Sequence, residues 1–167
     1  MANENYTSNG TSLLINGEAT ADYAFSVEGI SNGTGRVSAQ IDLGAAPRPF
    51  LYTWSSEVQF QATPTQYKGL ELYIATAPDD DSTQIDGDVG ASDAALGDVD
   101  MLRNLQQIGY VVSENAAAGE KCVASGDVEI FTRYVSIVAY NDSGATVNAT
   151  DSNFRFNLQP KFFVPGA

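Results

Sequence analysis

The side chains most able to do chemistry are the carboxylates of residues 79–100. This stretch contains no Lys or Arg, and glycines are interleaved with its acidic residues. Clustered carboxylates on flexible backbone are the oxygen ligands that Ca²⁺ prefers. The aspartates are Asp79, Asp80, Asp81, Asp86, Asp88, Asp93, Asp98 and Asp100. Of these, Asp79, Asp81, Asp86 and Asp88 are the candidate calcium ligands.

The spacing does not fit an EF-hand. Counting from Asp79, the sixth position is Gln84 instead of glycine, and the twelfth is Gly90 instead of glutamate. The alternative interpretation is a solvated surface loop that mutual repulsion between its charges keeps extended. On that interpretation, the loop could be shortened at little cost to stability.

The sequence contains few of the side chains on which catalysis usually depends. The chain has no histidine and a single cysteine, Cys122, so the common triads and general bases cannot be assembled. A lone cysteine in an apolar strand is typical of a buried core residue. A pair of carboxylates of the glycosidase type stays open as an alternative, although no spacing distinguishes one pair. We therefore expect a non-enzymatic protein without a cofactor.

The charge balance restricts the partners. Twenty-one acidic residues against eight basic ones give a net charge of −13, and the basic residues are scattered. Such a chain repels phosphate backbones and anionic lipid surfaces, so we expect neither nucleic acid nor membrane as a partner. The apolar runs are far shorter than the ~18 residues of a membrane span, which predicts a soluble protein made in the cytoplasm.

Apolar residues alternate with polar ones in many short segments separated by turn residues, for example at 23–27 and 154–158. A period of two predicts strands, and this density of strands is typical of a sandwich or barrel. We expect an all-β fold with little helix: an antiparallel β-sandwich, with a jelly roll as one form of it. The only helical expectation is a short turn at 91–96, extended by 99–102. The expected strands are 13–15, 23–27, 37–43, 50–60, 69–77, 105–112, 121–124, 128–131, 134–140 and 154–158.

Two segments are candidates for contacts with other proteins. Residues 1–10 are polar and aperiodic, which predicts a mobile arm whose residues Asn5, Tyr6 and Thr7 become ordered against a partner. Residues 11–167 then form a single domain. Tyr52 and Trp54 share one face of a strand, which favours half-buried core or interface residues over a sugar-stacking platform, and both are candidate interface residues.

The order of segments in the C-terminal half resembles small structural proteins of tailed bacteriophages. The resemblance covers about residues 70–160, including the acidic loop. It is carried by Arg103-Asn104-Leu105-Gln106-Gln107-Ile108-Gly109, Ala124-Ser125-Gly126-Asp127-Val128-Glu129-Ile130, Arg133-Tyr134-Val135-Ser136-Ile137-Val138 and Phe154-Arg155-Phe156-Asn157-Leu158-Gln159-Pro160. It implies a decoration or cement protein that binds the head and stabilises the capsid lattice, with the major capsid protein as partner.

Charge and symmetry sharpen this expectation. An acidic protein is repelled by packaged DNA, which favours the outer capsid surface of the virion. Closed cyclic assemblies are common, so we expect a homotrimer at three-fold positions. Two alternatives stay open: a carbohydrate-binding or host-attachment module, and a self-assembling coat or tail subunit.

Overall fold

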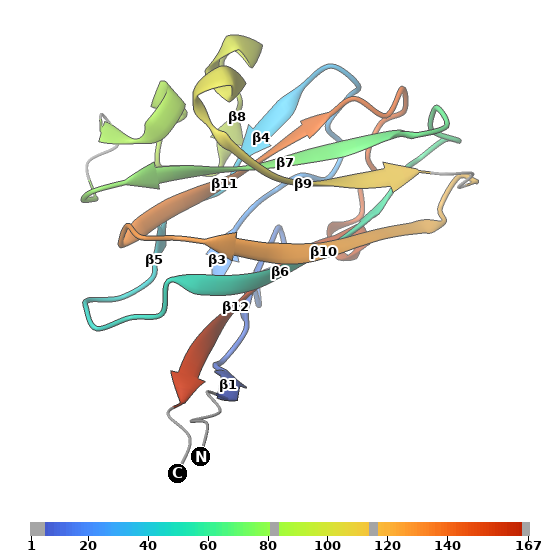
Figure 1. Cartoon of the computed structure of the whole chain (residues 1–167). Helices are drawn as coiled ribbons and strands as arrows, with labels where there is room; N and C mark the ends of the chain where they lie inside the picture. Colours follow the sequence, from blue (N-terminus) through green and yellow to red (C-terminus); the bar gives the residue numbers. More distant parts are fainter. Residues whose placement is uncertain (1–5, 81–83, 114–116, 165–167) are drawn as a thin grey trace.

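The computed structural model describes residues 6–80, 84–113 and 117–164, and it is built almost entirely from strands. Two six-stranded sheets pack against each other (Figure 1). All strand pairs are antiparallel except β2 with β3. The all-β sandwich expected from the alternating pattern is confirmed.

The first sheet has the last strand of the chain at its centre. Its order is β10-β6-β12-β2-β3, and β1 also pairs with β12. β12 therefore joins segments from the beginning and the middle of the sequence. The strands are β1 (Tyr6–Asn9), β2 (Leu13–Asn16), β3 (Tyr23–Ala24), β6 (Leu51–Gln59), β10 (Lys121–Glu129) and β12 (Phe154–Val164).

The second sheet is centred on β11 and β7. Its order is β8-β4-β11-β7-β9, and β5 also pairs with β11. The strands are β4 (Gly35–Val37), β5 (Ile41–Asp42), β7 (Lys68–Ala77), β8 (Ala94–Ala95), β9 (Gln106–Ser113) and β11 (Tyr134–Asn141). Three short 3-10 helices complete the described chain: η2 (Asp86–Asp88), η3 (Val99–Asn104) and η4 (Asp151–Asn153).

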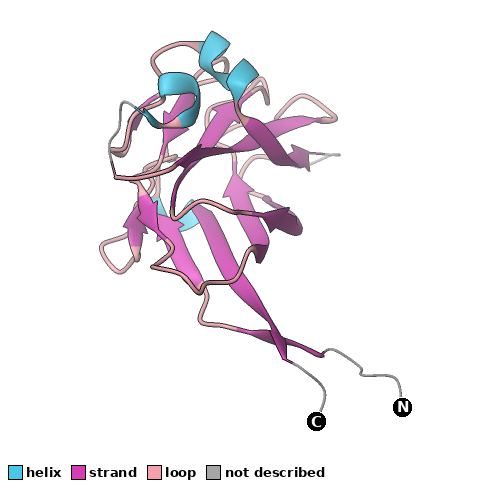
Figure 2. Ribbon diagram, turned by 60° about the vertical axis from the view of Figure 1, so that its left-hand side comes forward, coloured by secondary structure: helices cyan, strands magenta, loops and turns pink. Residues whose placement is uncertain are grey.

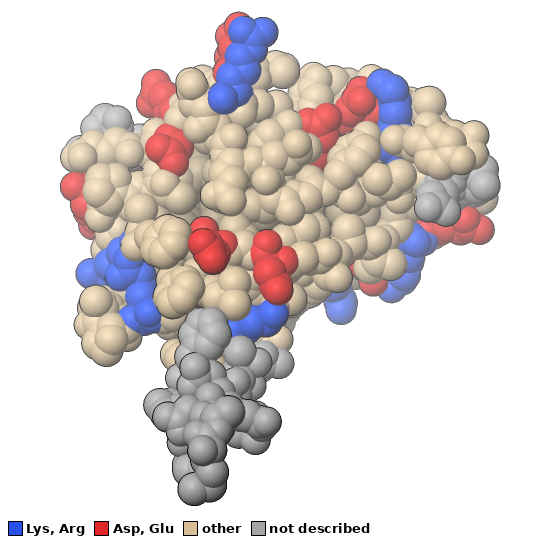
Figure 3. Space-filling model, in the orientation of Figure 1, with Lys and Arg blue, Asp and Glu red and all other residues tan. Residues whose placement is uncertain are grey.

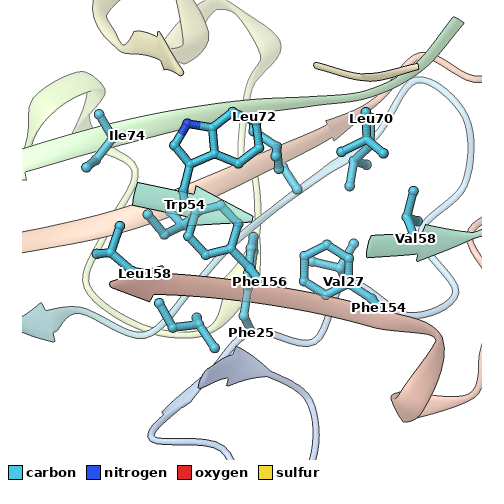
Figure 4. Close-up of a cluster of buried hydrophobic side chains, with 14 of the residues drawn as sticks. Phe25, Val27, Trp54, Val58, Leu70, Leu72, Ile74, Phe154, Phe156 and Leu158 are labelled. Carbon is cyan, nitrogen blue, oxygen red and sulfur yellow. The ribbon is translucent and has the colours of Figure 1, made fainter. Parts of the chain in front are cut away.

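The main core lies between the sheets. Along β6 every second side chain is buried, as a period of two requires. Phe154, Phe156 and Leu158 are fully buried, as the sequence predicts. Trp54 stacks on Phe156 with ring centroids 6.2 Å apart, and Phe25 meets Phe154 edge-on at 5.3 Å (Figure 4).

A second, smaller core lies on the outer face of the β11-centred sheet. Residues 84–105 of the acidic segment 79–105 fold over this face, and their short helices lie outside the sheet in Figure 2. The interpretation of this segment as an extended, solvated loop is therefore wrong, because apolar residues between its aspartates pack against the sheet. The buried members are Val37, Ala75, Ala77, Ile85, Val89, Leu102 and Val138.

The ends of several elements differ from the sequence prediction. β10 runs unbroken where two strands, 121–124 and 128–131, were expected. The expected helical turn at 91–96 instead contains β8, and the helix of this region is η3, from Val99 to Asn104. Residues 6–9, expected within an aperiodic arm, form β1 because the end of β12 supplies a backbone partner.

Candidate functional site

Two of the aspartates proposed as calcium ligands, Asp79 and Asp86, have other partners, and a third, Asp88, lies at the end of η2. The Asp86 carboxylate accepts hydrogen bonds from the backbone N–H and the hydroxyl of Thr76, at 3.0 and 2.6 Å. The Asp79 carboxylate accepts one from the Gln84 amide at 3.3 Å. Within the described ranges, no three acidic or cysteine side chains converge as a metal site would require. Asp81 lies outside the described residues. Through its two hydrogen bonds with Thr76, Asp86 connects the acidic segment to β7.

Asp93 connects the same acidic segment to the rest of the fold at a second point. Its carboxylate accepts bonds from the Arg36 guanidinium at 2.7 Å and the Ser26 hydroxyl at 2.6 Å. Partial burial raises the pKa of Asp93, but the hydrogen bonds from Arg36 and Ser26 outweigh it and hold the pKa below its usual value. The charge of Asp93 therefore serves the fold, joining β8 to β4.

Tyr52 and Trp54 do not lie on the surface. Each residue is 2 % exposed, so of the two interpretations that the sequence favoured they are core residues, and the expectation that they form an interface or a sugar-stacking row is wrong. Their shared face is the inner face of the sheet, where Trp54 packs against Gly109 of β9 and Gly126 of β10. Cys122 is also buried, as expected, and burial raises the pKa of its thiol.

The exposed aromatic residues lie elsewhere, at one end of the sandwich. We define the terminal face as the loop before β6, the turn after β10 and the adjoining part of β12, and Figure 1 places that loop and that turn at the same end of the sandwich. Phe50, Phe131 and Phe162 are 42 %, 70 % and 44 % exposed, and the rings of Phe50 and Phe131 stack 5.8 Å apart. A recess of ≈ 410 Å³ separates this loop from β12. It is lined by Pro47, Arg48, Pro49, Phe50, Lys161 and Phe162.

Arg48 is electrostatically distinct from the other basic residues. Its guanidinium donates a 2.6 Å hydrogen bond to the carbonyl oxygen of Phe131. Within the described part of the chain, no carboxylate forms a salt bridge with Arg48, whereas every other basic side chain has one at 2.6 to 3.8 Å. These seven are Arg36, Lys68, Arg103, Lys121, Arg133, Arg155 and Lys161.

Arg48 therefore lacks a direct salt bridge among the described residues, although, after the hydrogen bond from Arg133, its charge also helps to lower the pKa of the nearby Asp42. In a chain with a net charge of −13, this leaves the guanidinium able to form an ion pair with a partner. Basic atoms are visible at the lower left of Figure 3, beside the end from which the chain termini leave. The terminal face thus combines aromatic rings with a guanidinium, and both kinds of side chain are enriched at protein interfaces.

The terminal face also carries a projecting ribbon of two strands. β1 pairs with the end of β12, from Tyr6 with Val164 to Asn9 with Lys161. β6 leaves β12 at Lys161, which is its last partner there. Beyond that point the two-stranded ribbon extends away from the sandwich (Figures 1 and 2).

Sequence reasoning found part of this site. It chose Tyr6 and Thr7, whose backbone lies in the ribbon; Asn5 lies outside the described residues. It missed Arg48, Phe50 and Phe162. The available signal was Pro47-Arg48-Pro49-Phe50, in which an arginine stands between two prolines and an aromatic residue follows them, directly before an alternating strand pattern.

The chain was compared with known proteins. No family model matches the sequence, and no curated protein matches it. Among the residues that the structure describes, no helix has the length and apolarity needed to cross a membrane.

Proposed function

We propose that this protein is a non-enzymatic virion structural protein, a decoration or cement protein that binds the outer surface of a phage head and stabilises the capsid lattice. The sequence resemblance over residues 70–160 suggests this class of protein. The single structural observation that carries the proposal is Arg48, which forms no salt bridge among the described residues and lies among the exposed aromatic residues of the terminal face. In this proposal the terminal face contacts the major capsid protein.

The chemistry of the terminal face suits such a contact. Buried aromatic and arginine side chains supply most of the affinity at many protein interfaces. Phe50 and Phe131 would be removed from water, and Arg48 would gain a carboxylate from the capsid protein. The guanidinium is already oriented by the Phe131 carbonyl, so little side-chain freedom would be lost on binding.

The remaining surface agrees with an outward position. The net charge of −13 disfavours the lumen, where packaged DNA lies. We propose that the protein is made in the host cytoplasm and occupies three-fold positions as a homotrimer. Three contacts through one cluster would multiply weak binding into durable attachment.

The proposal is tested by binding to phage heads. Heads stripped of the protein are mixed with the intact protein, with Arg48→Gln and with the control Arg155→Gln, which removes a salt-bridged arginine away from the terminal face. Bound copies are counted by sedimentation and gel densitometry. We expect Arg48→Gln to weaken binding about tenfold or more, and Arg155→Gln to bind as the intact protein does.

Two results would refute the proposal. Intact protein that does not bind heads, and is absent from virions, would exclude the decoration function. Equal binding by Arg48→Gln and intact protein would exclude the terminal face as the capsid contact. Melting curves of both variants serve as the check that folding is preserved.

The alternatives have less support. The sugar-stacking platform depended on Tyr52 and Trp54, and both lie in the core. A self-assembling coat or tail subunit would form large shells or tubes on its own, which light scattering of the purified protein detects.

A further inference from the structure

The ribbon leaves backbone hydrogen-bonding groups of β12 without a strand beside them. The N–H of Gly10 donates to the carbonyl of Pro160 at 2.8 Å, so Pro160 faces β1. Because successive residues of a strand face opposite sides, Lys161 and Phe163 direct their backbone groups to the other side. At Lys161 that side is occupied by Leu51 of β6. At Phe163, no strand among the described residues pairs there.

β1 has a second open edge. By the same alternation, Ser8 exchanges backbone hydrogen bonds with Phe162, and Tyr6 does so with Val164. Thr7 and Asn9 therefore direct their N–H and C=O groups away from β12. The only described strand that pairs with β1 is β12. Each chain thus presents two different open edges on one projecting ribbon.

We infer that copies of this protein join through their ribbons, with the outer edge of β1 in one copy pairing with the open edge of β12 in the next. The two edges belong to different strands, so the contact is heterologous, and such contacts generate closed rings when the rotation permits. The right-handed twist of paired strands curves an added sheet and favours closure over few copies. Pairing would satisfy exposed backbone groups that otherwise invite aggregation.

Side chains at the ribbon's root favour the same contact. Phe162 is 44 % exposed and borders the recess beside Pro49 and Phe50, so a neighbouring strand would cover apolar surface there.

This inference rests on the proposed homotrimer, for which it names the subunit contact. It concerns the protein alone, without capsids. A protein that forms rings but does not bind heads would remove the proposed function and leave the inference standing. A monomer that decorates heads would do the opposite.

The test uses one backbone hydrogen bond donor. Thr7→Pro removes an N–H from the outer edge of β1 while keeping the bonds of Ser8 to β12, and proline is tolerated on an edge strand. Thr7→Val is the matched control, because valine is β-branched and keeps the N–H. Mass is measured by sedimentation velocity for the intact chain and both variants at equal concentration.

We expect the intact protein and Thr7→Val to sediment as a closed oligomer, with a trimer at three times the 17.7 kDa chain. Thr7→Pro should sediment as a monomer with an unchanged melting temperature. An intact protein that is monomeric at all concentrations, or a Thr7→Pro variant that assembles fully, would overturn the inference. Hydrogen exchange is a second measurement, since assembly should protect the amides of Thr7 and Phe163; exchange of both at the unprotected rate in the oligomer would also overturn it.

Discussion

At the scale of single residues, the strongest exposed ion pair is that of Asp42 with Arg133. The guanidinium donates two parallel hydrogen bonds to the carboxylate, at 2.7 and 2.6 Å, and also lies over the ring of Tyr134. The bond from Arg133 lowers the pKa of Asp42 to about 2. The pair connects β5 to the residue that precedes β11.

This lowered pKa predicts a dependence of stability on pH. Since the carboxylate of the folded protein ionises at lower pH than the usual 3.8, its stabilising effect is complete above about pH 4 and is lost as pH falls towards 2. Asp42→Asn should flatten the curve of unfolding free energy against pH in that window. Urea unfolding at several pH values measures it, with Asp100→Asn, from an exposed ion pair on η3, as the control. Equal slopes for Asp42→Asn and the intact protein would contradict the prediction.

At the scale of elements, the acidic segment is a folded cover for the β11-centred sheet. Ile85 is 4 % exposed and packs in the second core, while Asp86 and Asp93 tie the segment to β7 and β4. The carboxylates of Asp86 and Asp93 connect the segment to the sheet through hydrogen bonds, and its apolar residues pack against the sheet.

Ile85→Ala should therefore lower the free energy of unfolding by about 2 kcal/mol or more, because a buried methyl-rich side chain is lost and a cavity is left. Ser92→Ala, an exposed change in the same segment, should leave it within about 0.5 kcal/mol. Urea unfolding compares the two. If both variants were as stable as the intact protein, the segment would behave as the solvated loop that the sequence suggested.

At the scale of the whole molecule, Trp54 fills the space between the two sheets where their edge strands β9 and β10 approach each other. Its ring packs against Gly109 of β9 in one sheet and Gly126 of β10 in the other. A Cβ placed on Gly109 would lie 2.2 Å from the indole, which is far inside van der Waals contact. The glycines are needed here for space, and the closure of the two sheets depends on that space.

Gly109→Ala should lower stability by about 1–3 kcal/mol, the usual cost of overpacking a core. The control is Gly97→Ala, whose added Cβ would meet only the flexible end of Met101 at 3.3 Å. Thermal unfolding should show a clearly lower Tm for the first variant and a nearly unchanged Tm for the second. A normal Tm for Gly109→Ala would mean that the sheets can shift apart without cost.

Comparison of sequence and structure shows what alternation can predict. A period of two in the sequence identified most strands, and it placed Phe156 and Leu72 on buried faces. It did so because the apolar residues that alternate along such a strand lie on one side of the sheet. It could not say which face of β6 is buried, so Tyr52 and Trp54 were assigned to the surface. It also missed β1, because the partner of Tyr6 is Val164, at the opposite end of the sequence. Arg48 became a candidate only when the partners of all other basic residues were known.

The central position of β12 has a consequence for how the chain folds during synthesis. β12 leaves the ribosome after every other described strand, yet it is the described strand with which β1 pairs and one of two partners of both β6 and β2. β11, the centre of the other sheet, also emerges late. Earlier strands therefore keep unpaired edges until β11 and β12 have been synthesised. Long-range strand pairing of this kind is slow, and chains with unpaired edges tend to aggregate. The many carboxylates of the chain would help to keep it in solution until these strands have paired.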